Sequence, residues 1–293
     1  MANTEPNRRL VITGATGTVG EQVVRALRDR DAEVVAAVRD PDAAAEQLGE
    51  DIKLVEFDFT RPETWGFAFQ DADGLFLVRP PGEASLKGDL LPAVDAAVRS
   101  GIDHVVFLSV AGADRIPVLP HRRIERHIEG LGVDYTFLRA AFFMQNLSEV
   151  HRQDVVERDE LFVPAGDGET VFVDARDVGA VGAAALTGDG HRNRAYEVTG
   201  SDKMDYYEVA AVFSEVLGRE ITYAAPGPVE FVRRTYGGGT DLGFAVAMLF
   251  IYAPTRFGLT GEPTDTVEQI LGREPYTVRE FVSDYRDVFG PSV

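Results

Sequence analysis

The stretch "LVITGATGTVGEQVVRAL", residues 10–27, passes from a short apolar run through three evenly spaced glycines into a segment with helical spacing. Gly14, Gly17 and Gly20 follow the pattern G-x-x-G-x-x-G. In a strand–turn–helix unit, one such glycine permits a tight turn, another lets the backbone approach a pyrophosphate, and the third lets helix and strand pack closely. The helix N-terminus then offers N–H groups and a positive dipole end to the phosphates. The stretch therefore predicts a dinucleotide-binding turn; the alternative is a tight turn that holds no ligand.

The pattern of the opening unit continues through the first 140 residues. Helix-favouring segments alternate with six apolar runs, at residues 9–14, 33–39, 52–59, 74–80, 104–110 and 135–140. Strands that are apolar almost throughout are typical of a parallel sheet covered by helices on both faces. We therefore predict an α/β fold with a Rossmann-type, doubly wound parallel sheet. Residues 1–150 are expected to form the NAD(P)-binding domain, and residues 151–293 a smaller α/β substrate-covering part interleaved with it.

The C-terminal half shows looser patterning. A strand and a helix are expected over residues 170–188, with Asp177 near the helix start as a cap, and an amphipathic helix over 277–289. Residues 236–263 carry "YGGG" and the uncharged apolar run 244–253. This segment predicts a mobile flap, a helix over a pocket or the subunit contact of a homodimer.

The amino-acid composition excludes several classes of binding partner and of chemistry. With 48 acidic and 29 basic residues the net charge is −19, which argues against a nucleic acid or an anionic membrane as the main partner. The chain has no cysteine, so thiol chemistry is excluded. Its longest apolar run has about half the length that spans a bilayer, and its start lacks the features of a signal peptide. We expect a cytoplasmic protein that acts on a small molecule.

The end of the second strand indicates which dinucleotide is bound. NAD-binding sites place an acidic residue about 20 residues after the glycines, where it holds the ribose hydroxyl. Here Arg39 stands nineteen residues after Gly20, and an arginine can hold a 2′-phosphate bidentately. Asp40 follows directly. NADP(H) is therefore the preferred cofactor, and NAD(H) is the alternative.

Several motifs in one order resemble the NmrA-like branch of atypical short-chain dehydrogenases/reductases, which includes the type 2 NADPH:quinone oxidoreductases. The motifs are "TGATGTVG", "VRDP", "FDF", "HVVFLSVAGA", "HRRIERHIEGLGVDYTFLRAAFFMQNL" and "FVDARDVGAVGAAAL". The resemblance runs from the first strand to the final helix.

The resemblance implies a role for each matching residue. The pyrophosphate loop would comprise Gly14, Thr16, Gly17, Thr18 and Val19, and Arg39 would meet the adenosine phosphate. Residues expected along the rest of the cofactor are Asp58 and Phe59 by the adenine, Val78, Arg79 and Pro80 by the ribose, Ser109 at the end of the fifth strand, and Arg139, Ala140, Phe142 and Phe143 near the nicotinamide.

The chain departs from ordinary short-chain dehydrogenases in its chemistry. Those enzymes use a Tyr-x-x-x-Lys pair, in which the lysine lowers the tyrosine pKa so that the tyrosine can pass a proton. None of the three lysines here has a tyrosine four residues before it; they are Lys53, Lys87 and Lys203. Ser109 stands where those enzymes keep a serine.

His121 is the candidate catalytic residue. It begins the helix after the fifth strand, and it resembles a histidine of the quinone reductases in this branch. Histidine titrates near neutrality, so His121 can donate a proton or orient a carbonyl; the alternative is a helix-start histidine that faces solvent. Asn146, Tyr236 and Phe244 are the candidate substrate contacts. No histidine shows a spacing with carboxylates that indicates a metal site.

Two functions from different classes follow. The first is an NAD(P)H-dependent reductase that transfers hydride to a small conjugated acceptor, namely a quinone, an enone or an imine, with the proton supplied by His121 or solvent. The second is a non-catalytic NAD(P) redox sensor, since a sensor needs no Tyr-Lys pair. Apolar and aromatic residues in the C-terminal third, which can cover a substrate, favour the enzyme.

Overall fold

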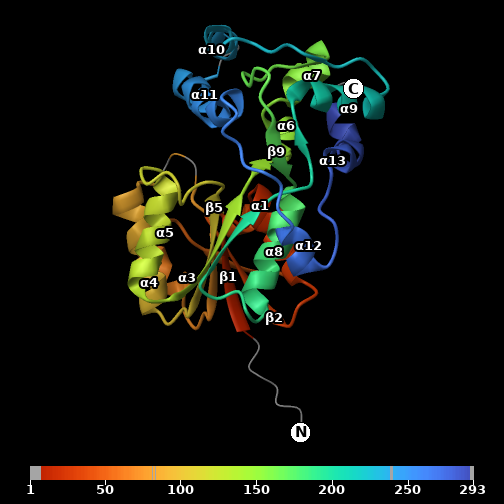
Figure 1. The fold of residues 1–293 in the computed structure, drawn as a ribbon. Coiled ribbons are helices and arrows are strands. Elements are labelled where there is room, and N and C mark those ends of the chain that lie inside the picture. The colour runs from red at the N-terminus through yellow and green to blue at the C-terminus, as the bar shows by residue number, and fades with distance from the viewer. Residues whose placement is uncertain (1–7, 81, 83, 238–239, 291–293) are drawn as a thin grey trace. The chain divides into compact units, whose positions relative to one another are not determined.

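The structure, a computed structural model, describes residues 8–80, 82, 84–237 and 240–290. By its internal contacts the chain divides into two units (Figure 1). The first comprises Met1–Ala140, Ala175–Val198 and Thr266–Arg273; the second comprises Ala141–Asp174, Thr199–Asp265 and Glu274–Val293. The units alternate along the chain, and residue 150, the boundary expected from sequence, lies within the second unit.

The first unit is built on a parallel sheet of seven strands. Its strands are β1 (Arg8–Thr13), β2 (Ala32–Val38), β3 (Lys53–Glu56), β4 (Gly74–Leu77), β5 (His104–Val110), β6 (Asp134–Ala140) and β10 (Arg194–Val198). They lie in the order β10-β6-β5-β4-β1-β2-β3, and every neighbouring pair is parallel. The chain thus builds outward from β1 to one edge and then returns to build the other, so the predicted doubly wound sheet is confirmed.

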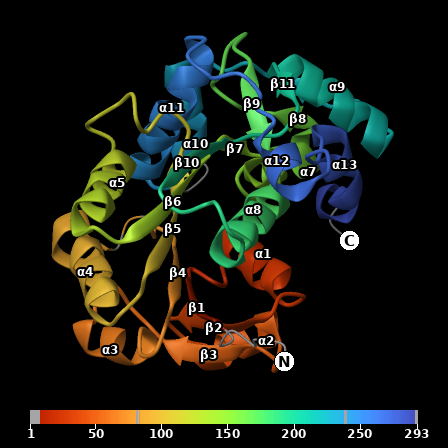
Figure 2. The same cartoon turned by 60° about the horizontal axis from the view of Figure 1, so that its bottom comes forward.

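Helices cover both faces of this sheet. The helices of the unit are α1 (Thr18–Leu27), α2 (Pro41–Leu48), α3 (Trp65–Ala68), α4 (Leu91–Arg99), α5 (Pro120–Leu131), α8 (Ala175–Thr187) and α12 (Thr266–Leu271), with short turns at η1 (Pro62–Thr64) and η2 (Leu86–Leu90). In Figure 2, α1 and α8 lie on one face and α3, α4 and α5 on the other. Strands buried on both faces explain why the sequence shows continuous apolar runs rather than alternation.

Small residues set the spacing between α1 and α8. A methyl group on Gly179 of α8 would lie 2.4 Å from the Cβ of Gln22 on α1. One turn later, a methyl group on Gly182 would lie 2.8 Å from the ring of Phe76 in β4. The segment "VGAVGAAAL" therefore lets α8 lie directly against α1 and the sheet. Asp177, in the first turn of α8, is fully buried and forms an ion pair with Arg273 at 2.8 Å.

The second unit combines short strands with helices around an aromatic core. Its strands are β7 (Phe142–Phe143), β8 (Glu160–Leu161), β9 (Thr170–Val173), β11 (Lys203–Met204) and β12 (Thr222–Tyr223). Its helices are α6 (Gln145–Glu149), α7 (Arg152–Arg158), α9 (Tyr206–Leu217), α10 (Pro228–Gly237), α11 (Leu242–Arg256) and α13 (Val278–Asp284), and the short turn η3 (Arg286–Phe289) follows the last of them. The strands pair in two small sheets, β11-β9-β7 and β12-β8. Phe172, Tyr206 and Tyr252 are fully buried between these elements.

The uncharged run 244–253 lies within α11. Ala245, Met248 and Tyr252 form the buried stripe of this helix, whereas Phe250 is 75% exposed. A helix is therefore the local structure, while Gly238 and Gly239 of "YGGG" lie outside the described residues. Within the described ranges, no helix is long and apolar enough to cross a membrane.

Replacing Gly20 with alanine is expected to destabilise the first unit, because the new methyl group would lie 2.0 Å from the carbonyl oxygen of Gly14. Overpacking of this kind lowers the free energy of unfolding by about 1–3 kcal/mol. Gly130→Ala on α5 is the matched control, because among the described residues nothing lies within 4 Å of its added Cβ. Denaturant unfolding followed by circular dichroism measures both changes. Equal stability of the two variants would contradict the close approach at Gly20.

Candidate functional site

The first loop of the sheet turns tightly from β1 into α1. Gly14 adopts a φ of +62°, which side chains rarely tolerate, and its carbonyl oxygen accepts a hydrogen bond from the Gly17 N–H at 2.9 Å. Gly17 is the N-cap of α1 and has no side chain with which to cap the helix. No side chain of Gly17 therefore covers the N–H groups in the first turn of α1, and N–H groups left open at a helix start can bind an anion. Thr16 and Thr18 flank Gly17, while Val19 packs in the core.

The end of β4 is fixed beside this loop. The Thr13 hydroxyl donates to the Phe76 carbonyl at 3.0 Å and accepts from the Val78 N–H at 2.9 Å. A methyl group on Gly14 would lie 3.2 Å from the Cβ of Val78. This pairing brings Val78, and Arg79 and Pro80 after it, to the same carboxyl edge of the sheet as the glycine loop.

Gln47 of α2 also reaches the loop, which the sequence did not predict. Its amide donates to the Thr16 carbonyl at 3.1 Å and to Glu21 of α1 at 2.8 Å. An exposed glutamine in a polar helix carries no signal in the sequence. Its effect here is to connect the helix that follows β2 to the glycine loop.

The carboxylate of Asp40, the acidic residue after β2, is hydrogen-bonded to the backbone of the next helix. Asp40 is the N-cap of α2, and its carboxylate accepts from the Ala43 N–H at 3.1 Å. A carboxylate used in this way is not positioned to hold a ribose hydroxyl as the acid of an NAD site does. Arg39 is exposed at the end of β2. The geometry thus favours the arginine over the aspartate as the ligand-facing group of this strand.

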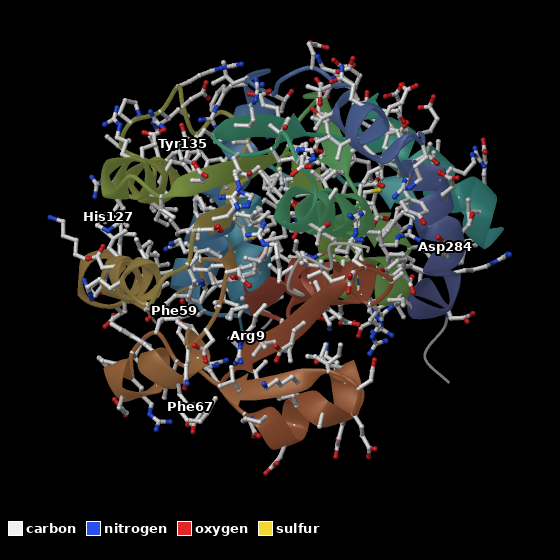
Figure 3. The ribbon with its side chains drawn as sticks, turned by 90° about the horizontal axis from the view of Figure 1, so that it is seen from below. Arg9, Phe59, Phe67, His127, Tyr135 and Asp284 are labelled. Atoms are coloured by element: carbon white, nitrogen blue, oxygen red, sulfur yellow. The ribbon has the colours of Figure 1, made fainter. Side chains whose placement is uncertain are left out.

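Asp58 and Phe59 follow β3. Burial raises the pKa of Asp58, but hydrogen bonds from Thr60 and the charge of Arg39 outweigh it and leave the pKa below its ordinary value. Phe59 is buried, with its ring edge-on to Phe57 at 4.8 Å between centroids. Figure 3 labels Phe59 and also Phe67 on α3, which is 75% exposed. Asp58 is therefore an ionised group near Arg39, and the Phe59 ring belongs to the core.

His121 lies in the first turn of α5. Its imidazole stacks on Phe107 of β5, with 6.0 Å between centroids and 25° between planes. Burial and then the charge of Arg79 lower the pKa of His121 to about 4, against the opposing charge of Glu125. The imidazole is therefore neutral at pH 7, although the sequence suggested titration near neutrality. A neutral imidazole still donates one N–H, which favours the hydrogen-bonding role over proton donation.

Ser109 and Arg139 are both engaged by Glu125, a residue that sequence reasoning missed. The buried Ser109 hydroxyl donates to Glu125 at 2.7 Å, and Arg139 donates two hydrogen bonds to it at 3.0 Å each. The spacing of the helix could have indicated Glu125, because it stands one helical turn after His121 and among the apolar positions Ile124 and Ile128 that face the core. Ala140, also expected at the nicotinamide, is buried at the end of β6.

Five of the candidate residues belong to the second unit. Phe142 packs edge-on to Phe172 at 5.9 Å and against Tyr252 at 5.3 Å between centroids, so its ring is part of the core. Phe143 completes β7, and Asn146 is half-buried on α6. Tyr236 on α10 is 59% exposed and Phe244 on α11 is 45% exposed. Asn146, Tyr236 and Phe244 are therefore accessible side chains within this unit.

Comparison with known proteins places this geometry in a family. The chain is 32% identical to the NAD(P)H azoreductase of Xenophilus azovorans, over 96% of this chain and 99% of the relative. Its fold matches an NADPH-dependent quinone oxidoreductase of Escherichia coli, solved with NADPH, with a TM-score of 0.86, 23% identity, and coverage of 94% and 99%. It also matches the triphenylmethane reductase of Citrobacter sp., solved with NADP(H), with a TM-score of 0.83, 23% identity, and coverage of 94% and 99%. The sequence model of the NmrA-like family matches residues 6–287 of this chain. The resemblance seen in the motifs is thus confirmed, and the protein belongs to the NmrA-like family.

Proposed function

We propose that the protein is an NAD(P)H-dependent reductase that transfers hydride to a small conjugated acceptor. The observation that carries this proposal is the carboxyl edge of the first unit's sheet. There the uncapped start of α1, the end of β4 and the half-buried His121 occur together. Ligands of doubly wound sheets bind at this edge. The azoreductase, quinone oxidoreductase and triphenylmethane reductase named above are reductases, which supports the same class of reaction.

NADP(H) is the cofactor that the residues fit best, with NAD(H) as the alternative. Gly14 and Gly17 would hold the pyrophosphate at the start of α1, and Arg39 would hold the 2′-phosphate, since Asp40 is engaged as the cap of α2. Asp58 would lie toward the adenine. Two of the relatives were solved with NADPH or NADP(H), in support of this assignment.

When bound, the cofactor would supply the hydride, so the chain needs to stabilise the negative charge that hydride leaves on the acceptor. Arg79 is half-buried, and within the described part of the chain its guanidinium makes no hydrogen bond or ion pair. Its charge is close enough to lower the pKa of His121. A cation and a neutral N–H donor beside each other are suited to a developing anion. With this pair the reaction would not need a tyrosine–lysine relay, and the final proton would come from solvent.

The acceptor class follows from what such a site can provide. Quinones, enones and imines delocalise the negative charge left by hydride, so weak electrostatic assistance suffices. Asn146, Tyr236 and Phe244 are proposed as acceptor contacts because each is accessible and able to contact a planar molecule through an amide or a ring. The uncharged run 244–253 of α11 serves either that purpose or the subunit contact of a homodimer.

The proposed reaction is tested by following NADPH oxidation with a panel of acceptors. The panel contains a quinone, an enone, an imine, an azo dye and a triphenylmethane dye, and NADPH affinity is measured in parallel by calorimetry. Turnover with at least one class is expected. Tight NADPH binding with no turnover across the panel would replace the reductase with the non-catalytic redox sensor. Absence of binding would refute both.

Arg39→Ala is expected to weaken NADPH binding by about 1.5–3 kcal/mol, or roughly 10- to 10²-fold, because it removes a charge-assisted contact to phosphate. NADH binding should change little, since NADH lacks the 2′-phosphate. Arg99→Ala at the exposed end of α4 removes the same charge elsewhere and serves as control. Calorimetric titration of both cofactors into each variant measures the difference. An equal loss of NADPH and NADH affinity in Arg39→Ala would contradict the 2′-phosphate assignment.

His121→Ala is expected to lower kcat about 10²-fold, the usual effect of removing one donor to a developing anion. Because the pKa of His121 is about 4, its neutral form is fully present near neutral pH. The kcat of the wild type should therefore stay level between about pH 5 and 8. Arg126→Ala, at an exposed position of the same helix, is the control. A kcat that falls as pH rises through about 6.5, and that loses this dependence in His121→Ala, would show that His121 is a general acid instead.

A further inference from the structure

Glu125 is a fully buried carboxylate with four hydrogen-bond donors around it. One oxygen, Oε1, accepts from the Ser109 hydroxyl at 2.7 Å and from Arg139 Nε at 3.0 Å. The other, Oε2, accepts from Arg139 Nη2 at 3.0 Å and from Arg122 Nη1 at 2.9 Å. An ionised carboxylate offers about four lone-pair sites. All of them are filled, so Glu125 has no acceptor site left for a ligand or a water molecule.

The charges around Glu125 keep it ionised. Burial raises the pKa of Glu125, but hydrogen bonds from Arg139, Ser109 and Arg122, together with the charge of Arg139, reverse this and hold the pKa below its ordinary value. Arg139 also faces Asp114 at 3.4 Å, and Arg122 also faces Glu129 at 3.2 Å. A carboxylate held in this way by two guanidinium groups neither takes up nor releases a proton near neutral pH. Its role is therefore not acid–base chemistry.

The geometry of the bonds ties three elements together. Ser109 of β5 and Arg139 of β6 are directly paired across the sheet, at the carboxyl edge. Glu125 of α5 contacts both, and so fixes the helix to the ends of two strands. On another side of the helix, His127 bonds Asp95 of α4 at 2.6 Å (His127 is labelled in Figure 3). Since His121 is one turn before Glu125 and on the same face, the carboxylate determines where that turn lies.

The bond to Ser109 has a chemical consequence. A serine hydroxyl has one proton, and here it is donated to Glu125. Ser109 therefore has only lone pairs left, and cannot donate a hydrogen bond to the oxygen of an acceptor. By contrast, the neutral imidazole of His121 keeps an N–H that has no hydrogen-bond partner among the described residues.

We propose that Glu125 is a positioning residue of the reductase site, which holds α5 on β5 and β6 so that the His121 imidazole stays stacked on Phe107. The inference rests on the proposed function. It assigns Ser109, Arg122 and Arg139 to the support of His121, and not to direct contact with the reacting atoms.

Glu125→Gln tests the proposal. The amide keeps the size of the side chain, removes its charge and places an N–H₂ group against the donors of Arg122 and Arg139. Displacement of a reacting group by about 1 Å lowers turnover about 10²-fold, so kcat is expected to fall by roughly 10- to 10²-fold, with the Kd for NADPH unchanged. Glu129→Gln is the matched control, because Glu129 lies on the same helix and contacts Arg122, but reaches neither strand. Its kcat should equal that of the wild type.

Two readouts separate positioning from general stability. In a double-mutant cycle, Glu125→Gln combined with His121→Ala should be no slower than His121→Ala alone, because both changes remove the same contribution. The ¹⁵N signals of the His121 imidazole should shift in Glu125→Gln and not in Glu129→Gln. Multiplicative losses in the cycle, or a Glu125→Gln variant with wild-type kcat and unchanged His121 signals, would overturn the proposal.

Ser109→Ala provides a second route if Glu125→Gln does not fold, because it keeps both arginine pairs. It should lower kcat in the same direction by a smaller factor, again without further loss when combined with His121→Ala. Unchanged kcat and unchanged His121 signals in Ser109→Ala would overturn the proposal in that case. If the wild type reduces no acceptor, the proposed function fails, and the imidazole signals of the NADPH complex still report whether Glu125 positions His121.

Discussion

The site depends on one close approach between backbone atoms, that of Gly20 to the carbonyl of Gly14. A methyl group on Gly20 would lie 2.0 Å from that oxygen, well inside van der Waals contact. Without a side chain there, α1 can begin directly over the end of β1. The same turn brings Val78 against Gly14 and so aligns the ends of β1 and β4. The position of the start of α1 and that of the residues after β4 therefore both depend on the absence of a side chain at Gly20.

The protein has a net charge of −19, and the arginines at this edge of the sheet differ in whether a carboxylate neutralises them. Arg122 and Arg139 share the buried Glu125, and each also pairs with a second carboxylate, Glu129 and Asp114 respectively, so their positive charge is neutralised within the protein. Arg79 remains as a cation near His121, and it acts on the imidazole through its field. The distinction matters because arginines of equal formal charge in the sequence differ in what they can offer a ligand. Only a charge that is not already neutralised by a buried partner is available to an incoming anion.

The sequence predicted the sheet well because a strand's apolar pattern reflects its immediate surroundings. Residues 104–110 form β5 as expected, and 33–39 match β2 to within one residue. The third run, 52–59, ends early as a strand at Glu56, because the Asp58 side chain turns the chain by accepting from Thr60. The short elements of the second unit were less evident, since two-residue strands such as β7 have no periodicity to detect.

The parts of the site that the sequence missed arise from contacts distant along the chain. Glu125 looks like one more charge on a polar helix, and only folding brings Ser109 and Arg139 to it from two strands. The sequence placed Asp40 directly after Arg39 but gave no sign that its carboxylate caps a helix, which only the direction of the side chain shows. The neutral state of His121 depends on burial and on Arg79, neither of which is visible in local sequence.

The alternation of the two units along the chain constrains how the protein can be made. The strand β10 at one edge of the sheet and the helix α8 over one face come from residues 175–198, after the chain has already entered the second unit. The helix α12, which packs along α8, comes later still, at 266–271. During synthesis, the first unit therefore stays without an edge strand and part of its cover until most of the chain has been made. Domains usually fold in order from the N-terminus, but here the first unit is completed almost last, and an N-terminal fragment ending near residue 140 would expose the apolar face that α8 covers.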